Sequence, residues 1–427
     1  MKFISTNNSG IEESTMNELR KEVSAYVEDC REIAAQHDYE KEEASLCLVD
    51  DVGLVAQVEK IVAAKKTDKL KYIIDVGIGG SNLGTKAIYD AVYGATDILQ
   101  PDRRPRMIFL DTTDPEYLFH FTQFFKTQSF KEGEVVVNII SKSGGTTETA
   151  VNGELVIDLL KGVSDSWKNM CVVTTDKGSK LYENALALGI DVLEIPKKVG
   201  GRYSVFSAVG LFPLALCGID IRSMLKSATA MRDMCLSLGT DNIAVTSAAI
   251  LYAHMKKGIS INDNFYFHTE LESMGKWYRQ LMGESTGKNG MGLTPTVSMG
   301  SVDLHSVVQL YLGGPKNKYT SFVYTNIFKE VQIPLFNTLT HIKEIEGRPV
   351  GEIMRAIQQG TIAAYKNLNL PYSETVLEGV SADEVAAYMQ FKMLEMMFLG
   401  KMMKVNTFDQ PQVELYKIET KKILAKK

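Results

Sequence analysis

The 427-residue sequence has few of the features that mark secreted, membrane-bound or metal-binding proteins. Its five cysteines are scattered, odd in number and never paired as C-x-x-C, which favours reduced thiols and a cytoplasmic location. Its six histidines show no H-x-x-x-H or similar spacing, so we expect no bound metal. The apolar run at the start is too short for a signal peptide, and the most apolar stretch, 208–219, is too short to span a bilayer.

Charge of one sign is not concentrated anywhere along the chain. The 47 basic and 52 acidic residues are mixed, without a polybasic run, and the formal net charge is −5. Nucleic acids and membranes are therefore not expected as partners. An anionic small substrate would need a local binding site. The 45% hydrophobic and 23% charged residues are typical of a globular protein, and the length suggests two domains.

Short apolar, β-rich runs alternate with helix-like segments, which predicts parallel sheets covered by helices on both faces. In the first half, a charged helical region (1–45) precedes these runs, and 147–162 reads as a helix. The expected strands are 72–79, 106–111, 134–141, 169–176 and 191–196. The pattern resumes after about residue 203, with expected strands at 264–270, 294–300 and 320–326 and expected helices at 247–258, 383–403 and 412–427. We therefore expect an α/β protein with one domain over 1–200 and a second over 201–427.

The first stretch that could carry chemistry is D-V-G-I-G-G-S-N-L-G, 75–84, where a strand meets a helix. Glycines let backbone N–H groups approach an anion, and a helix N-terminus favours negative charge. The alternative is an ordinary tight turn. The dinucleotide fingerprint fails because Asn82 occupies the place of its third glycine, and no P-loop lysine follows.

The second stretch is S-K-S-G-G-T-T-E-T, 141–149, which also follows an expected strand. Its hydroxyl groups, glycines and single lysine suit a phosphate, which has several acceptor oxygens and needs many donors. A helix cap would account for one serine or threonine. Five hydroxyl residues exceed that need, so we favour phosphate binding.

Two charged residues elsewhere stand beside glycines. Arg202 follows Gly200 and Gly201 and precedes an apolar run, a place where a solvated arginine is not expected. A buried guanidinium could stabilise an oxyanion there. Glu284 lies in G-E-S-T-G-K-N-G, 283–290, which reads as a polar, glycine-rich loop, and for an arbitrary glutamate an exposed carboxylate is the ordinary interpretation.

Two further stretches are ambiguous on their own. His305 lies between apolar residues, where a satisfied core histidine is the usual explanation. If Asp409 caps a helix that starts near Pro411, then Gln410, Glu414 and Lys417 share one helix face. Solvated charge is the default interpretation of such a face.

Taken together, these stretches resemble the glucose-6-phosphate isomerase family, in its shorter prokaryotic form. The motifs V-G-I-G-G-S-N-L-G, S-K-S-G-G-T-T-E-T, G-G-R-Y-S-V-F-S-A-V-G-L, G-E-S-T-G-K, D-L-H-S and F-D-Q-P-Q-V-E-L-Y-K occur in the family's order across residues 76–417. The family often has an aromatic and a hydroxyl residue where this chain has Gly144 and Gly145. The resemblance implies two sugar-isomerase (SIS-type) α/β/α domains, flanking terminal helices and a homodimer with an active site between domains.

The resemblance also implies roles for individual residues in isomerising glucose 6-phosphate and fructose 6-phosphate. Glu284 would be the general base, Arg202 would support the enediolate, and His305 (from the neighbouring subunit) and Lys417 would assist ring opening. The phosphate would be held by Ser141, Lys142, Ser143, Thr146 and Thr149. The sugar site would be lined by Gly80, Ser81, Gly201 and Gln410.

This chemistry requires no redox cofactor or metal. The nearest alternative is another SIS-type isomerase, acting on mannose 6-phosphate or on both sugars. A second alternative is a non-catalytic sugar-phosphate sensor, which would not need Glu284, Arg202 and Lys417 together. A dehydrogenase is weakened by the failed dinucleotide fingerprint.

Overall fold

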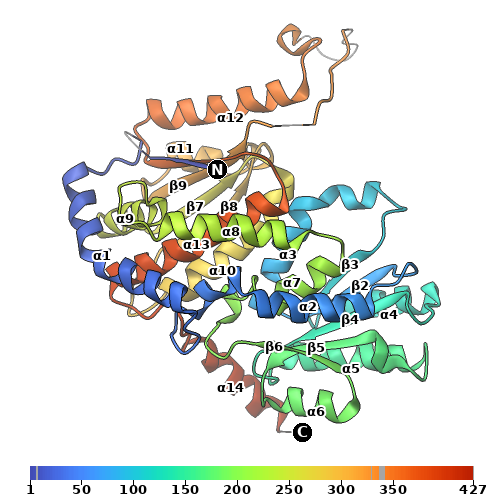
Figure 1. The fold of residues 1–427 in the computed structure, drawn as a ribbon. Coiled ribbons are helices and arrows are strands. Elements are labelled where there is room, and N and C mark those ends of the chain that lie inside the picture. Colours follow the sequence, from blue (N-terminus) through green and yellow to red (C-terminus); the bar gives the residue numbers. More distant parts are fainter. Residues whose placement is uncertain (6–7, 328, 336–341, 427) are drawn as a thin grey trace.

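Two five-stranded sheets organise the chain in the computed structural model, which describes residues 1–5, 8–327, 329–335 and 342–426 (Figure 1). The first sheet is parallel throughout, in the order β3-β2-β4-β5-β6. Its strands are β2 (Tyr72–Val76), β3 (Arg106–Leu110), β4 (Val135–Ile140), β5 (Cys171–Asp176) and β6 (Asp191–Ile195). All five lie where the sequence predicts strands, with ends up to three residues shorter.

The second sheet has the order β1-β10-β9-β7-β8, and only the β1–β10 pair is antiparallel. Its strands are β1 (Lys2–Ile4), β7 (Ile261–Tyr266), β8 (Thr294–Met299), β9 (Lys318–Thr325) and β10 (Tyr372–Leu377). Strands β1 and β10 were not expected from the sequence. The prediction of helix over 1–45 is wrong for β1, because Lys2, Phe3 and Ile4 pair with β10, and helix α1 covers only Glu13–Gln36.

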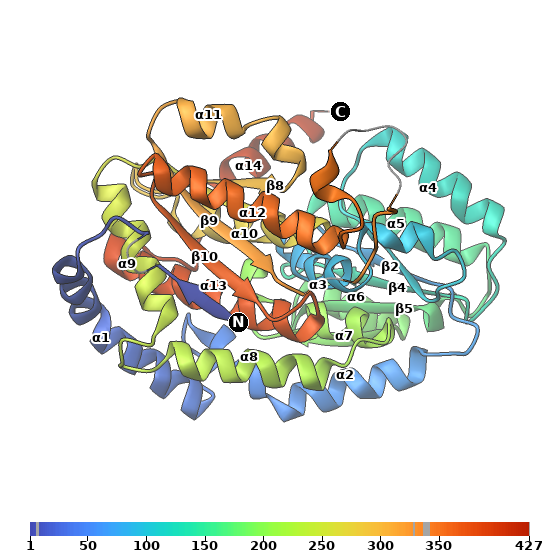
Figure 2. The same ribbon diagram turned by 90° about the horizontal axis from the view of Figure 1, so that it is seen from above.

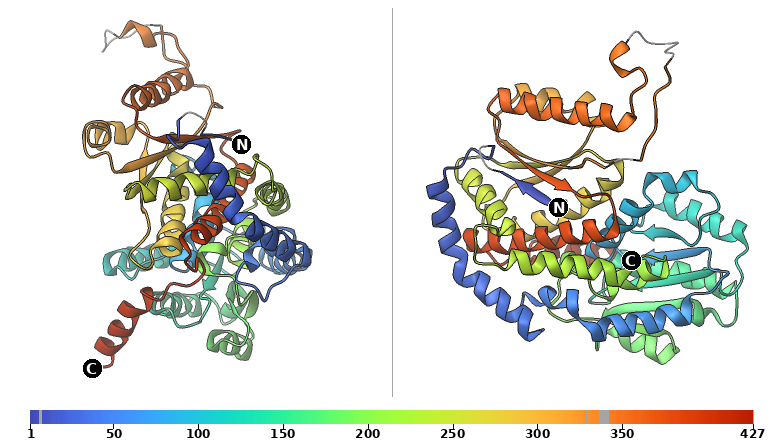
Figure 3. Two further views of the ribbon diagram at one scale, coloured as in Figure 1. Left: turned by 90° about the vertical axis from the view of Figure 1, so that its left-hand side faces the viewer. Right: turned by 45° about the horizontal axis from the view of Figure 1, so that its top comes forward.

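Helices cover both faces of the first sheet (Figures 1 and 3). Because side chains alternate along a strand, Ile73 and Ile74 of β2 enter two different hydrophobic clusters. The cluster on one face includes residues of α2 (Val52–Lys65), α3 (Leu83–Val92) and α7 (Ala208–Leu216). The cluster on the other face includes residues of α4 (Pro115–Gln128), α5 (Thr147–Lys161) and α6 (Lys180–Leu188).

The second sheet is layered in the same way (Figure 2). Tyr365 of α12 (Val350–Asn367) packs on Phe322 of β9, and α11 (Val308–Gly313) lies on the same side. The opposite face meets the large central cluster, which includes residues of α8 (Ile221–Cys235), α9 (Ile243–Lys256), α10 (Glu272–Thr286) and α13 (Ala382–Met403). The predicted α/β class, with helices on both faces of mainly parallel sheets, is confirmed.

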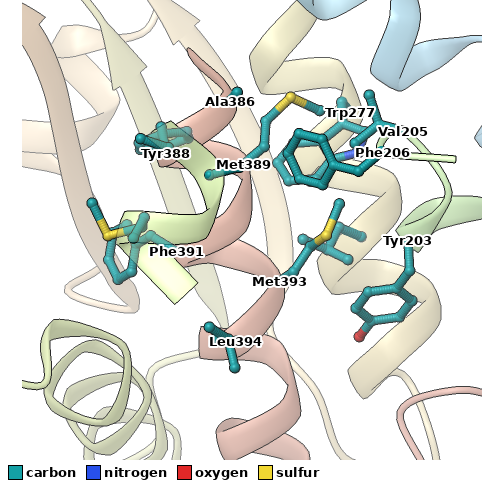
Figure 4. Packing of buried hydrophobic residues seen from close by; sticks show 14 of the residues in the cluster. Tyr203, Val205, Phe206, Trp277, Ala386, Tyr388, Met389, Phe391, Met393 and Leu394 are labelled. Atoms are coloured by element: carbon teal, nitrogen blue, oxygen red, sulfur yellow. The ribbon is translucent and has the colours of Figure 1, made fainter. Parts of the chain in front are cut away.

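Helix α13 lies in the centre of the molecule and is buried on every side. A helix with mostly apolar residues on every side belongs in a core, and here Met389 and Met393 fill the space beside α10 (Figure 4). Trp277 of α10 packs close to Val205 and Phe206, which follow Arg202 in the chain (Figure 4). This packing fixes α10 relative to the segment that carries Arg202.

The last helix, α14 (Val413–Leu424), projects from the body and buries no residue (Figure 3). It confirms the expected C-terminal helix, of which Lys427 lies outside the described residues. No helix in the described ranges is long and apolar enough to cross a membrane. The division at residues 200/201 stays a prediction.

Candidate active site

The order in which the chain adds strands to the first sheet changes side between β2 and β4. After β2 the chain adds β3 on one side, and then returns to place β4 on the other side of β2. Ligands of open parallel sheets bind outside the carboxyl ends of the strands at such a point. The glycine stretch 77–82 follows β2 and the hydroxyl-rich stretch 141–146 follows β4, so both lie at this edge. A Cβ on Gly77 would lie 3.4 Å from Cβ of Ile140, the last residue of β4.

The hydroxyl-rich stretch leads into α5, and some of its polar groups make no bond to the rest of the described protein. Thr146 is the N-cap residue of α5, but its side chain makes no capping hydrogen bond. Ser141 Oγ donates to Thr146 Oγ1 at 3.3 Å. Thr149 is 3% exposed, and its Oγ1 has no hydrogen-bond partner among the described residues. A buried hydroxyl and an uncapped helix N-terminus are what an anion would satisfy.

The backbone of this stretch explains its glycines. Gly144 has a φ of +68°, and a Cβ there would lie 2.8 Å from Cβ of Leu181. A larger residue would therefore be both strained and crowded.

Lys142 lies half-buried in the same stretch. Burial lowers the pKa of its ammonium, because charge is costly where water is scarce. The carboxyl group of Asp176 acts in the opposite direction but less strongly. A bound phosphate would favour the charged form of Lys142. The ammonium could then form a charge-assisted hydrogen bond to the phosphate.

The end of β5 holds the stretch in position. Thr175, fully buried, donates its hydroxyl to the carbonyl oxygen of Ser141 at 2.7 Å. The amides add two bonds, from Ser141 N to Thr174 O (3.2 Å) and from Asp176 N to Lys142 O (3.1 Å).

The glycine stretch touches the segment that carries Arg202. A Cβ on Gly80 would lie 2.1 Å from the carbonyl carbon of Gly201, so only glycine permits this approach. Ser204 Oγ donates to Gly80 O at 3.3 Å. Ser81 lies beside this contact in the short 3₁₀ turn Gly79–Ser81.

Arg202 is buried, as the sequence suggests, with 1% of its surface exposed. Its Nε donates to Ser285 Oγ (3.0 Å) and its Nη1 to Glu284 Oε2 (3.1 Å) and Gln410 Oε1 (2.5 Å). Its Nη2 donates to the carbonyl oxygens of Thr407 and, at 3.0 Å, Asp409. Three distant parts of the sequence therefore meet at one guanidinium.

Glu284 lies in the last turn of α10, so its placement on a loop was wrong. Its side chain is 24% exposed. Its second oxygen, Oε1, accepts from Gln280 Nε2 at 3.1 Å, one helical turn earlier. A Cβ on Gly79 would lie 2.9 Å from Gln280 Nε2, so the glycine stretch and this face of α10 are in contact. Both carboxylate oxygens are thus held while part of the group stays accessible.

Gln280 was missed by sequence reasoning. An isolated glutamine has no signature of its own, and only its i, i+4 spacing from Glu284 on a helix could have indicated the pair.

The condition considered for the C-terminal stretch, with Asp409 as the cap of a helix starting near Pro411, is not met. Helix α14 starts at Val413, its N-cap is Gln412 without a side-chain cap bond, and the Asp409 carboxylate instead pairs with Lys288 Nζ at 2.9 Å. Gln410 precedes the helix and points to Arg202, so it does not share a helix face with Lys417. Lys417 pairs with Glu414 at 2.7 Å on the projecting helix.

His305 ends a short 3₁₀ turn (Val302–His305) that follows β8, and its side chain is exposed. The core-histidine interpretation is therefore excluded. Asp303 fixes the turn, because its carboxylate accepts from Met299 N (2.7 Å) and from Ser306 Oγ (2.6 Å). In the described part of this chain, neither His305 nor Lys417 makes a hydrogen bond or ion pair with Glu284 or Arg202.

The fold and this geometry define a two-sheet α/β protein with a candidate site for a small anionic ligand. Comparison with known proteins narrows the class. A family model described as phosphoglucose isomerase matches residues 56–316. The glucose-6-phosphate isomerase of Methanocaldococcus jannaschii is 33% identical over 370 residues, covering 86% of each chain. That of Thermus thermophilus is 31% identical over 358 residues, covering 82% of this chain and 83% of the relative.

Solved structures agree in fold. A hypothetical protein from Thermus thermophilus has a TM-score of 0.86 at 28% identity over 99% of both chains. A glucose-6-phosphate isomerase from Chlamydia trachomatis has a TM-score of 0.73 at 22% identity, covering 90% of this chain and 75% of that one. The chain belongs to the glucose-6-phosphate isomerase family, as its motifs indicate.

Proposed function

We propose that this protein catalyses the reversible isomerisation of glucose 6-phosphate and fructose 6-phosphate, in glycolysis and gluconeogenesis. The observation that carries the proposal is the Glu284 carboxylate, held by Arg202 and Gln280 and still partly exposed. The face of α10 that presents it touches the glycine stretch at the same sheet edge as the hydroxyl-rich stretch. Relatives of similar length bear the name of this activity.

The phosphate is the remote handle of the substrate. We assign its binding to Ser141, Lys142, Ser143, Thr146 and Thr149, supported by the unpartnered Thr149 hydroxyl and the uncapped start of α5. The binding energy of the phosphate then positions C1 and C2 for reaction. The sugar itself would lie against Gly80, Ser81, Gly201 and Gln410, which the contacts above bring around Arg202.

Glu284 is the proposed general base. It removes the proton from C2 of the open-chain aldose, the C2 electron pair forms the C1–C2 double bond, and the carbonyl oxygen becomes an enediolate oxygen. The proton of the C2 hydroxyl passes to the oxygen on C1, and Glu284 returns its proton to C1, which gives the ketose. The guanidinium of Arg202 stabilises the developing negative charge.

Ring opening must come first, because an aldose phosphate is mostly cyclic. An imidazole transfers protons near neutral pH, which suits His305, and Lys417 assists. Since His305 is exposed and does not contact Glu284 within one chain, we assign it to the site of a second copy.

We further infer a homodimer with shared active sites, in the cytoplasm. Helix α14 and the segment that follows β9 project from the body (Figures 1 and 3). Both carry exposed apolar side chains. On α14 these include Leu415, which is 65% exposed, and on the segment that follows β9 they include Leu335, which is 69% exposed. Such surfaces are typical of subunit interfaces.

Incubating the pure protein with fructose 6-phosphate and identifying the aldose tests the proposal. Glucose 6-phosphate is the expected product. Mannose 6-phosphate alone would indicate the alternative isomerase, and both sugars together would indicate dual specificity. Binding without any turnover would indicate a sensor and would contradict the proposal.

A further inference from the structure

The segment 406–410 lies in the connection between α13 and α14. It contains Gln410, whose side chain accepts a hydrogen bond from Arg202. It is a connection without helix or strand, yet two buried cations hold it. Arg202 donates to the carbonyl oxygens of Thr407 and Asp409 and to the Gln410 side chain. Lys288 donates to the carbonyl oxygen of Asn406 and pairs with the Asp409 carboxylate at 2.9 Å.

Lys288 comes two residues after the end of α10 and is 7% exposed. Its ammonium also donates to the carbonyl oxygen of Ser285 at 3.3 Å. The last carbonyl groups of a helix lack partners within the helix and attract a cation. An ammonium has three donors, and these three acceptors use all of them. Lys288 therefore joins the end of α10, next to Glu284, directly to segment 406–410.

Asp409 links the two cations. Its carboxylate accepts from Lys288, and its main-chain carbonyl oxygen accepts from Arg202 Nη2 at 3.0 Å. A shift of Asp409 away from Lys288 would therefore also change the acceptors of Arg202. Because Arg202 Nη1 bonds both Glu284 and Gln410, the same shift would reach the carboxylate.

We propose that Lys288 and Asp409 form a latch that positions segment 406–410, so that the Arg202 guanidinium stays aimed at Glu284. The donors of Lys288 are already used within the protein, so it acts through Arg202 and not on the substrate. Its effect on turnover rests on the proposed function. Its effect on the segment does not.

The competing interpretation is an ion pair that only stabilises the fold. Asp409 is 51% exposed, and ion pairs with exposed partners contribute little to stability. The latch and the purely stabilising pair can therefore be separated by comparing local and global effects.

The test uses Asp409→Asn, which keeps the size and the main-chain carbonyl, together with Lys288→Met and the double variant. Hydrogen exchange measured by mass spectrometry on peptides covering 404–412 should be faster in all three. Turnover of fructose 6-phosphate should fall about tenfold in each single variant with KM changed less than kcat, and the double variant should be no worse than Lys288→Met. Glu272→Gln, which removes an exposed ion pair to Lys276 at 2.8 Å on the same helix, is the control and should behave as wild type.

Unchanged exchange over 404–412 in Asp409→Asn would overturn the latch. Because this variant replaces a half-exposed side chain, it tests the latch even if Lys288→Met does not fold. Faster exchange with unchanged kcat would also overturn it, as would fully additive losses in the double variant. A wild-type protein without isomerase activity would instead contradict the proposed function, and the exchange experiment would still decide whether the latch holds the segment.

Discussion

Replacing Glu284 with glutamine removes the proposed base with little change in shape. Arg202 would keep its four other acceptors, on Ser285, Thr407, Asp409 and Gln410, and the new amide oxygen could accept from Nη1. The hydrogen bond from Arg202 is weakened, and the bond from Gln280 Nε2 is lost where the new NH₂ replaces Oε1, so the free energy of unfolding should fall by no more than about 4 kcal/mol. The variant should therefore fold and retain substrate.

The loss of turnover is a separate effect from this loss of stability. Proton transfer by a positioned group contributes about 10²- to 10⁴-fold, so kcat for fructose 6-phosphate should fall at least about a hundredfold. Proton NMR in D₂O measures both the aldose formed and the deuterium carried into C1 or C2, and Glu272→Gln on the same helix is the control. Turnover within about threefold of wild type, or undiminished deuterium uptake, would refute the assignment of Glu284.

Three other changes probe the same geometry. Gly80→Ala should lower both the melting temperature and kcat, because its Cβ would lie 2.1 Å from the Gly201 carbonyl carbon. Gly360→Ala, with nothing within 4 Å inside helix α12, should leave kcat unchanged and should not lower the melting temperature. Equal behaviour of the two variants would contradict the close approach. Burial lowers the pKa of Lys142, so KM for fructose 6-phosphate should rise as the pH rises and Lys142 loses its charge. Lys142→Arg should flatten this rise. The same rise in both proteins would exclude Lys142 as its cause. Truncation after Gln412 should yield a monomer by light scattering and abolish turnover, and an active truncated dimer would contradict the assigned role of α14.

The strands of the first sheet could be predicted because parallel strands buried on both faces read as continuous apolar runs, as in β4, where every residue is buried. Strand β1 has only three residues, and β10 has three polar residues in a row, Ser373 to Thr375, so neither gave such a run. The loop interpretation of Glu284 also failed, because Glu284 lies in helix α10. Gly283 and Gly287 are typical of a loop, but burial of Trp277 and Tyr278 extends α10 past Gly283.

Contacts between distant segments were beyond local patterns. The burial of Arg202 was indicated by its glycine and apolar neighbours, whereas its bonds to Gln410 and to the Asp409 carbonyl depend on how the C-terminal segment returns to Arg202. A helix starting near Pro411 would have had Asp409 as its cap. Lys288 captures its carboxylate instead, at a sequence separation that no capping rule covers. The ion pair with the buried Lys288 ammonium therefore takes the place of the helix cap that the local sequence favours.

The most direct measurement is a crystal structure of the protein with a five-carbon hydroxamate phosphate, a mimic of the enediolate. We expect its phosphate against residues 141–149, its hydroxamate oxygens beside Glu284 and Arg202, and His305 of a second copy near the ring-opening position. A phosphate bound elsewhere, with Glu284 out of reach of the two carbons that react, would contradict the account.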